Sequence, residues 1–201
     1  MHDQEPIFNQ LAERDHERIC FHQDPETGLK AIVAIHSTAL GNALGGTRRW
    51  FYESEPDAIY DVLRLSKGMT YKAAISGLPM GGAKSVIMLP KKDHPRTEAE
   101  ARAMGKFVNT FGGAYIAAED VGVDIQYIDW MAAETAHVMG GDTEGAQIYA
   151  TQGSQNTHEE GAPKTGREER TSKKSDRKPH WTAERRKTHS RFPTTLARRT
   201  F

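Results

Sequence analysis

GGAKSVIML, residues 81–89, is a short run of small and apolar residues that ends at Pro90. From Ser85 onward the run is continuously apolar, which is typical of a strand covered on both faces, as the strands of parallel sheets are. Such a strand requires helices on both sides of its sheet. The run therefore predicts an α/β fold, and the sequence around it is expected to alternate between helices and strands.

Helix and strand signals do alternate on both sides of this run. Ser54 begins a capping box with a proline in the first turn, and the apolar spacing after it predicts a helix. Thr97 opens another helix that ends at Gly112, and Asp124 is placed to cap a last one. The expected helices are 54–65, 69–74, 97–111 and 124–131, and the expected strands are 85–89, 115–118 and 137–139.

Two β-prone runs, 17–23 and 29–37, precede this region and are separated by a segment with Pro25 and Gly28. This pattern predicts an antiparallel hairpin with a short loop. The segment 41–47 consists mainly of Gly and small residues and is predicted to be a loop. The expected fold is thus α/β, with a mostly parallel sheet flanked by helices and an antiparallel hairpin at the N-terminus. Such sheets carry their ligand groups at the C-terminal ends of the strands.

Charge divides the chain into two unlike parts. The 201 residues carry 27 Lys and Arg against 27 Asp and Glu, but residues 1–150 hold 14 basic and 21 acidic residues, whereas 151–201 hold 13 and 6. The last part contains no Val, Ile, Met, Tyr or Cys, so it cannot bury a core. We expect a folded domain over 1–148 and a polar, basic tail over 149–201.

Three interpretations of this tail stay open. It is a disordered, solvated extension, a segment whose basic clusters and aromatic residues contact a polyanion, or the product of a change of reading frame. The composition favours the third interpretation, because odd sequence follows a normal domain without a terminating signal. The balanced charge of the whole chain gives no preference for nucleic acid, and nucleic acid is not an expected partner.

Other classes of protein are disfavoured by simple counts. Cys20 is the one cysteine, which excludes an intrachain disulfide framework and a site with several thiolates. No window approaches the length of an apolar membrane helix, and the first ten residues do not resemble a secretion signal. The histidines have no metal-binding spacing. We therefore expect a cytoplasmic protein with no membrane partner and no metal.

Three ionisable residues carry the strongest chemical signal. Lys72 and Lys84 each follow small residues at a predicted junction of elements, and Asp120 follows the strand expected at 115–118. A lysine in a water-poor pocket loses its proton more easily and can act as an acid or base near neutral pH. Two lysines and a carboxylate around a hollow would suit a substrate with a carboxylate group. The spacing alone still favours surface lysines and an Asp120 that caps a turn.

Three longer blocks add a family resemblance. They are GLKAIVAIHSTALGNALGGTRRW at 28–50, DVLRLSKGMTYKAAISGLPMGGAKSVI at 61–87 and YIAAEDVGVDIQYIDWM at 115–131. In this order and with these gaps they resemble the N-terminal domain of the glutamate/leucine/phenylalanine/valine dehydrogenases, most of all the leucine and phenylalanine branch. The resemblance implies oxidative deamination of an L-amino acid to its 2-oxo acid and ammonia, with hydride transfer to NAD, in a homo-oligomer formed through this domain.

The resemblance also implies roles for particular residues. Lys72, in GMTYK, would pair with the substrate carboxylate, and Lys84, in GGAK, would activate the water that attacks the imino carbon. Asp120, in AAEDVG, would exchange a proton with the substrate amino group. The residues implied to line the carboxylate end are Gly45, Gly46 and Met69.

Two further residues bear on specificity. Glutamate-specific relatives place a lysine where this chain has Leu44, and Ala118 is expected across the pocket. An apolar Leu44 would leave a buried side-chain carboxylate of glutamate unpaired, at a cost of several kcal/mol. The resemblance therefore implies a branched-chain or aromatic amino acid as substrate.

The sequence departs from the family pattern in one major respect. The dinucleotide-binding domain of the family is expected after residue 150, yet no G-x-G-x-x-G occurs anywhere in the chain. We therefore expect no dehydrogenase turnover from this polypeptide alone. The alternative function is a non-catalytic module that binds an amino acid or forms an oligomer. For Arg48 the sequence leaves open whether it faces solvent or a partner chain.

Overall fold

The computed structural model describes residues 5–142. The expected tail at 149–201, with the disorder, polyanion contact or frame change considered for it, lies outside the described residues. In chain order the elements are α1 (Ile7–Arg14), β1 (Arg18–Asp24), β2 (Leu29–Ser37), β3 (Ala43–Trp50), α2 (Glu55–Ile75), β4 (Gly81–Met88), α3 (Glu98–Asn109), β5 (Tyr115–Ala118), α4 (Ile125–Ala132) and β6 (Val138–Met139).

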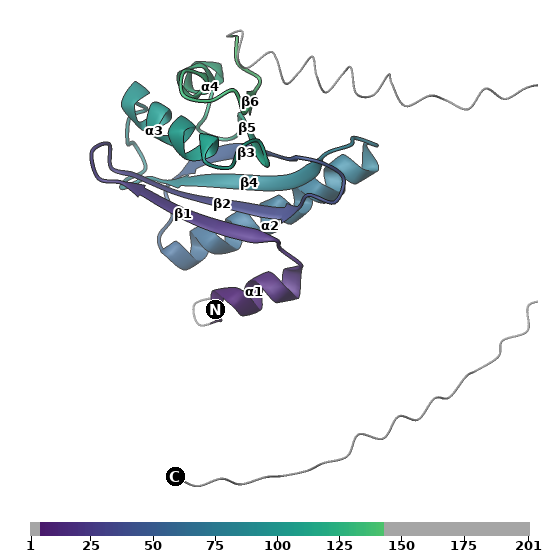
Figure 1. Cartoon of the computed structure of the whole chain (residues 1–201). Coiled ribbons are helices and arrows are strands. Elements are labelled where there is room, and N and C mark those ends of the chain that lie inside the picture. Colours follow the sequence, from purple (N-terminus) through teal and green to yellow (C-terminus); the bar gives the residue numbers. More distant parts are fainter. Residues whose placement is uncertain (1–4, 143–201) are drawn as a thin grey trace, which may run out of the picture. The chain divides into compact units, whose positions relative to one another are not determined.

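The strands form one mixed sheet in the order β1-β2-β4-β3-β5-β6 (Figure 1). β1 and β2 make the predicted antiparallel hairpin, and β2 also pairs with β4 in antiparallel fashion. The pairs β4–β3, β3–β5 and β5–β6 are parallel. This arrangement confirms the predicted α/β class, with an N-terminal hairpin joined to a largely parallel sheet.

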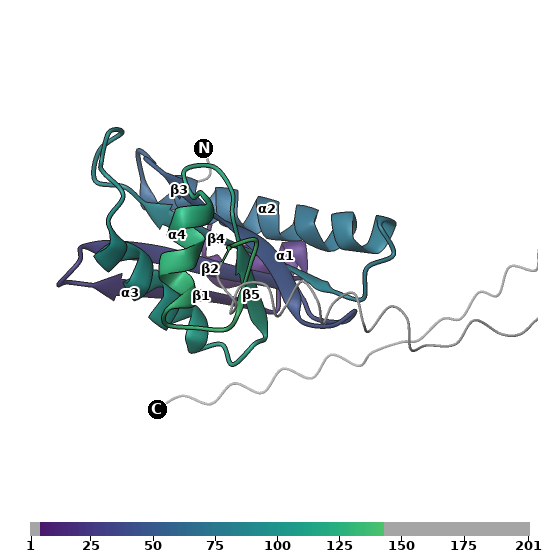
Figure 2. The same ribbon diagram turned by 90° about the horizontal axis from the view of Figure 1, so that it is seen from above.

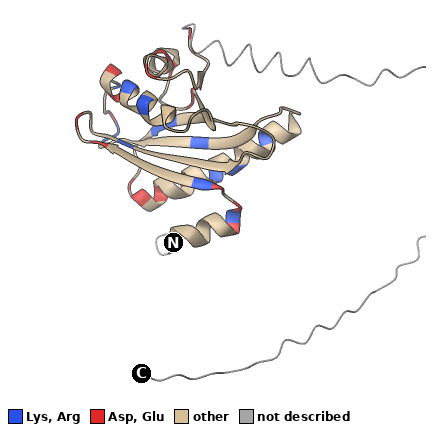
Figure 3. Ribbon diagram, in the orientation of Figure 1, with Lys and Arg blue, Asp and Glu red and all other residues tan. Residues whose placement is uncertain are grey.

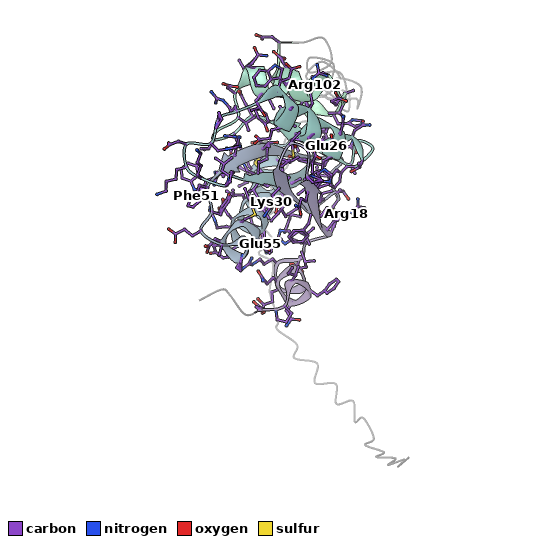
Figure 4. All side chains as sticks on the ribbon, turned by 90° about the vertical axis from the view of Figure 1, so that its left-hand side faces the viewer. Arg18, Glu26, Lys30, Phe51, Glu55 and Arg102 are labelled. Carbon is purple, nitrogen blue, oxygen red and sulfur yellow. The ribbon has the colours of Figure 1, made fainter. Side chains whose placement is uncertain are left out.

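Helices cover both faces of the sheet. In Figure 1, α3 and α4 lie above the strands and α1 and α2 below them, and in Figure 2, viewed from above, α3 and α4 lie in front. Figure 4 shows the same layers from the side, with Arg102 of α3 above, Glu55 of α2 below and Lys30 of β2 between them. Each face has its own cluster of buried apolar side chains. The face toward α2 is called the α2 face below.

The caps predicted for α3 and α4 are present. The Thr97 side chain accepts a hydrogen bond from the Glu100 backbone amide, and Asp124 accepts one from that of Tyr127. The apolar stripe predicted for 97–111 is buried. These local signals predicted the α3 and α4 layer correctly because each cap lies within four residues of the group it bonds.

The prediction of two helical pieces after Ser54 is wrong in one respect. α2 is a single helix of 21 residues that includes both the 54–65 and the 69–74 segments. Gly68 lies in its interior, where an added Cβ atom would meet nothing within 4 Å. The glycine weakens the helix without breaking it, because packing on β2 and β4 holds both halves.

The prediction of a loop at 41–47 is also wrong. Residues 43–50 form β3, a central strand between β4 and β5. Gly45 and Gly46 of this strand have no room for a side chain, because neighbouring groups occupy that space. An added Cβ atom on Gly45 would overlap the Ala83 carbonyl of β4. The glycines thus mark a close approach of backbone and side chains rather than flexibility.

Charged residues are sparse in the strands and frequent on the helices and loops (Figure 3). A charged side chain inside this sheet therefore needs a specific reason. Lys84 is such a residue, because it lies within β4 and is only 5% exposed. The prediction that Lys84 lies at a junction of elements is accordingly wrong, since the strand begins at Gly81 and continues beyond it.

Candidate functional site

Lys84 and Asp120 form an ion pair on the α2 face. The Nζ atom of Lys84 lies 2.8 Å from Oδ2 of Asp120, which follows the C-terminal end of β5. Lys84 pairs in register with Ala34 of β2, a residue of the apolar cluster under α2, which fixes the face it occupies. Lys84 is thus a buried lysine whose ammonium group contacts a carboxylate.

Gly46 makes room for this pair. A Cβ atom added there would lie 2.8 Å from Cβ of Asp120, 2.8 Å from the Glu119 carbonyl and 3.1 Å from Nζ of Lys84. Real Cβ atoms do not come so close to backbone groups. Glycine at position 46 therefore allows three strands to bring a lysine and an aspartate together in the sheet.

Burial and the ion pair act on the two pKa values in different ways. Burial lowers the pKa of Lys84 below its ordinary value, and the hydrogen bond and charge of Asp120 offset this only in part. Burial alone would raise the pKa of Asp120, but hydrogen bonds and charges from Lys84 and Arg48 outweigh it, so that pKa is lowered. The pair therefore combines a lysine that loses its proton more readily than a free lysine with a carboxylate that is more acidic than a free one.

Arg48 belongs to the same cluster, although the sequence left its surroundings open. Its Nε atom donates to Oδ2 of Asp120 at 3.0 Å, and its Nη1 atom donates to Oδ2 of Asp61 on α2 at 2.9 Å. Tyr52 also donates to Asp61, at 2.9 Å. A usable signal was present, because Arg48 is two residues after Gly46 and alternation puts both on one face. The contact with Asp61, the second acid that faces Arg48, could not be read from the sequence.

The predicted lining residues occupy several positions around the pair. Leu44 and Ala118 are half-buried and lie on the α2 face, where Gly46 pairs in register with Ala118. α2 packs mainly on β2 and β4 and only slightly on β3, whereas the principal helix contact of β5 is with α3. Gly45 points to the opposite face, and its carbonyl accepts a hydrogen bond from Tyr115 at 3.0 Å.

Lys72 and Met69 lie in the C-terminal half of α2. Helical spacing puts Asp61, Leu65, Met69 and Lys72 along one side of the helix. Asp61 of this side contacts Arg48, so the side runs along the border with β3. Lys72 is exposed, and among the described contacts it forms no ion pair with Asp120. The structure thus brings Lys84 and Asp120 into contact and leaves Lys72 as a separate cation on the adjoining helix.

Cavities lie beside the cluster as well. One of about 420 Å³ is lined by Arg48, Trp50, Tyr52, Asp61 and Val121. Another of about 640 Å³ opens near Arg49 and the 92–96 loop. Neither cavity is lined by Lys84 or Asp120. We place the candidate site at the Lys84–Asp120 contact, because a buried lysine beside a carboxylate identifies chemistry better than cavity size does.

The described residues show no place for a metal or a dinucleotide. No group of three His, Cys, Asp or Glu side chains within residues 5–142 could hold a metal ion. Gly45 and Gly46 lie inside a strand with their open sides filled by Ala83 and by the Lys84–Asp120 pair. Gly81 and Gly82 begin a strand, whereas a phosphate-binding turn leaves a strand and opens a helix. Among the described helices, none is long and apolar enough to cross a membrane.

Comparison with known proteins gives a family match for most of the described residues. The family model described as "Glu/Leu/Phe/Val dehydrogenase, dimerisation domain" matches residues 16–137. The leucine dehydrogenase of Bacillus cereus is 53% identical over 135 residues, which are 67% of this chain and 36% of that protein. The phenylalanine dehydrogenase of Caldalkalibacillus thermarum is 46% identical over 134 residues, 66% of this chain and 35% of that one. The chain thus spans about a third of the length of these relatives.

A solved structure gives the same result. The L-tryptophan dehydrogenase of Nostoc punctiforme superposes with a TM-score of 0.64 at 39% identity, over 67% of this chain and 40% of that one. The likeness covers the fold that holds the Lys84–Asp120 pair.

Proposed function

The chain belongs to the Glu/Leu/Phe/Val dehydrogenase family, and from this premise we propose that residues 5–142 form the substrate-binding and proton-transferring part of an L-amino-acid dehydrogenase. The reaction would be oxidative deamination of an amino acid to its 2-oxo acid and ammonia, with NAD as hydride acceptor. The observation that supports this most directly is the buried Lys84 in contact with Asp120 beside Gly46.

The two residues of the pair are suited to different proton transfers. Lys84, whose pKa burial lowers, would take a proton from the water that attacks the imino carbon of the oxidised substrate. Asp120 would exchange a proton with the substrate amino group. Lys72, exposed on the neighbouring helix, would pair with the substrate carboxylate, with Gly46 and Met69 at that end of the pocket. Gly45, whose open side is turned to the other face, would contribute its backbone only.

The half-buried Leu44 and Ala118 support an apolar substrate. Both lie on the α2 face with Gly46, and neither can pair with a charged side chain. A glutamate side chain there would lose its hydration without gaining a cation, at a cost of several kcal/mol. We therefore propose a branched-chain or aromatic amino acid as substrate, with the leucine-type relatives in support.

Residues 5–142 do not fit NAD, because the glycine pairs at 45–46 and 81–82 lie within or at the start of strands and do not form a phosphate-binding turn. Binding of NAD would require sequence other than residues 5–142, and the printed chain has no G-x-G-x-x-G. We expect no NADH formation when the 201-residue polypeptide is mixed with NAD and leucine or phenylalanine. The matched dimerisation-domain model further supports a homo-oligomer, and we propose a cytoplasmic location.

Binding of a 2-oxo acid tests this proposal without requiring turnover. Calorimetry on the full chain should show heat with 4-methyl-2-oxopentanoate and less affinity for 2-oxoglutarate. Lys72→Ala should weaken binding about tenfold or more, because it removes the cation for the carboxylate. Lys106→Ala is the control, since Lys106 is exposed on α3, which covers the other face. Equal binding by the Lys72 variant, or a preference for 2-oxoglutarate, would contradict the proposal.

A further inference from the structure

Arg48 and Lys84 contact the same oxygen atom of Asp120. Nζ of Lys84 lies 2.8 Å from Oδ2 and Nε of Arg48 lies 3.0 Å from it. Among the contacts of residues 5–142, no hydrogen bond reaches Oδ1 of Asp120. The two cations therefore hold the carboxylate by one oxygen and leave the other as the oxygen that a substrate amino group can reach.

Arg48 is itself held from the far side. Its Nη1 atom donates to Oδ2 of Asp61, which also accepts the Tyr52 hydroxyl. The second oxygen of Asp61 accepts Nη2 of Arg64 at 2.8 Å. The guanidinium thus spans two carboxylates, one after β5 and one on α2. A planar donor group fixed at both ends has little freedom to leave Asp120.

The charges of this cluster give Arg48 a distinct consequence for Lys84. If Lys84 were the sole cation beside Asp120, it would tend to stay protonated, because its deprotonation would leave a buried carboxylate without a counter-charge. Arg48 keeps its charge at every working pH and already compensates Asp120. Lys84 can then become neutral without leaving Asp120 alone. Its positive charge also repels the ammonium of Lys84 directly.

We propose that Arg48, anchored by Asp61, is the positioning residue of the Lys84–Asp120 pair: it fixes Asp120 through Oδ2 and supplies the permanent counter-charge that lets Lys84 release its proton. The catalytic meaning rests on the function proposed above, but the effect on the pair does not. The charged and titratable groups around the pair are Arg48 of β3, Asp61 and Arg64 of α2, and Tyr52, whose pKa is raised by burial and by Asp61.

NMR titration of the full chain tests the inference directly. The signals of the Lys84 Nζ group and the Asp120 carboxyl group would be followed against pH in the wild type, Arg48→Gln and Arg48→Lys. Arg48→Gln should raise the pKa of Lys84 by about one, because one nearby cation is lost. It should also raise the pKa of Asp120. Arg48→Lys, which keeps the charge, should restore most of both values.

The control is Arg96→Gln, because Arg96 forms an exposed pair with Asp124. It should leave both titrations unchanged. An unchanged pKa of Lys84 in Arg48→Gln overturns the proposal. Should that variant not fold, Arg48→Met takes its place, because it also removes the positive charge and leaves Asp61 in place. An unchanged pKa of Lys84 there overturns the proposal equally. Failure of the wild type to bind 4-methyl-2-oxopentanoate would count against the proposed function only.

Discussion

Arg48 and Arg49 are neighbours in β3, yet they belong to opposite faces of the sheet. The Arg48 side chain is 22% exposed and joins Asp61 and Asp120 on the α2 face. The Arg49 side chain is 4% exposed and pairs with Glu100 of α3 on the other face. Alternation along a strand separates two adjacent residues of the same type by the full thickness of the sheet.

The two clusters also differ in how completely their polar atoms are bonded. Arg49 donates to both oxygens of Glu100 and to the carbonyls of His94 and Pro95, and Tyr127 donates to Glu100 as well. That cluster ties the 94–95 loop to α3 and leaves little for a ligand to bind. Both clusters border a cavity, but among the described contacts only the Arg48 cluster retains an unbonded carboxylate oxygen, Oδ1 of Asp120. Completeness of bonding thus separates a structural ion pair from a candidate site.

The largest expected effect comes from breaking the buried pair. Arg49→Met should lower the free energy of unfolding by about 3–5 kcal/mol, because it leaves Glu100 buried without its cation. Urea unfolding followed by circular dichroism measures this loss. Arg48→Met, at the partly exposed cluster, should cost clearly less. Equal losses in both variants would show that exposure does not distinguish the two arginines.

A second prediction concerns the glycine beside the pair. Gly46→Ala should lower the free energy of unfolding by about 1–3 kcal/mol, since the added methyl group meets Asp120, Glu119 and Lys84. Displacement of the pair should also weaken 2-oxo-acid binding about tenfold or more, by calorimetry.

Gly68→Ala is the matched control for this substitution. The same methyl group there meets nothing within 4 Å inside α2 and should stabilise the chain by about 0.5–1 kcal/mol, with binding unchanged. A Gly46→Ala variant as stable as Gly68→Ala would contradict the close packing described for β3.

Sequence patterns predicted the outer layers of the fold better than its centre. The hairpin and the α3 and α4 caps depend on bonds between residues close in the chain, so Thr97 and Asp124 were sufficient to place them. β3 was mistaken for a loop because the reason for Gly46 lies in Lys84 and Asp120, which are distant in sequence. The residue pattern of a single segment cannot predict a contact with residues so far away in the sequence.

The same limit applies to the site. The family resemblance pointed to Lys84 and Asp120, and the structure places them in contact. The resemblance did not point to Asp61, the residue of α2 that anchors Arg48 in the cluster. Ion pairs across three elements depend on strand order, and β4 lies between β2 and β3 only because α2 carries the chain back over the sheet.

A smaller effect than that of Arg49→Met is expected at a neutral polar group on the α2 face. The Nε2 atom of His16 lies 3.0 Å from the Leu63 carbonyl, and its Nδ1 atom is buried without a hydrogen-bond partner in the described structure. Burial chiefly, together with the charges of His36, Arg14 and Lys67, lowers the pKa of His16 to about 4. The folded protein thus favours the neutral form of His16, whereas the arginines of β3 remain charged and form ion pairs.

The direction of the pH effect follows from that pKa. His16 of the unfolded chain titrates near 6.5, so between about pH 6.5 and pH 4 the unfolded state binds more protons and stability falls as the pH falls. After allowance for partial exposure, the loss should be about 1–2 kcal/mol by urea unfolding at pH 7 and pH 4.5. His16→Gln can still donate to the Leu63 carbonyl and does not titrate, so its pH dependence should be shallower. An equally steep dependence would assign the effect to other groups, among them His36, whose pKa burial also lowers.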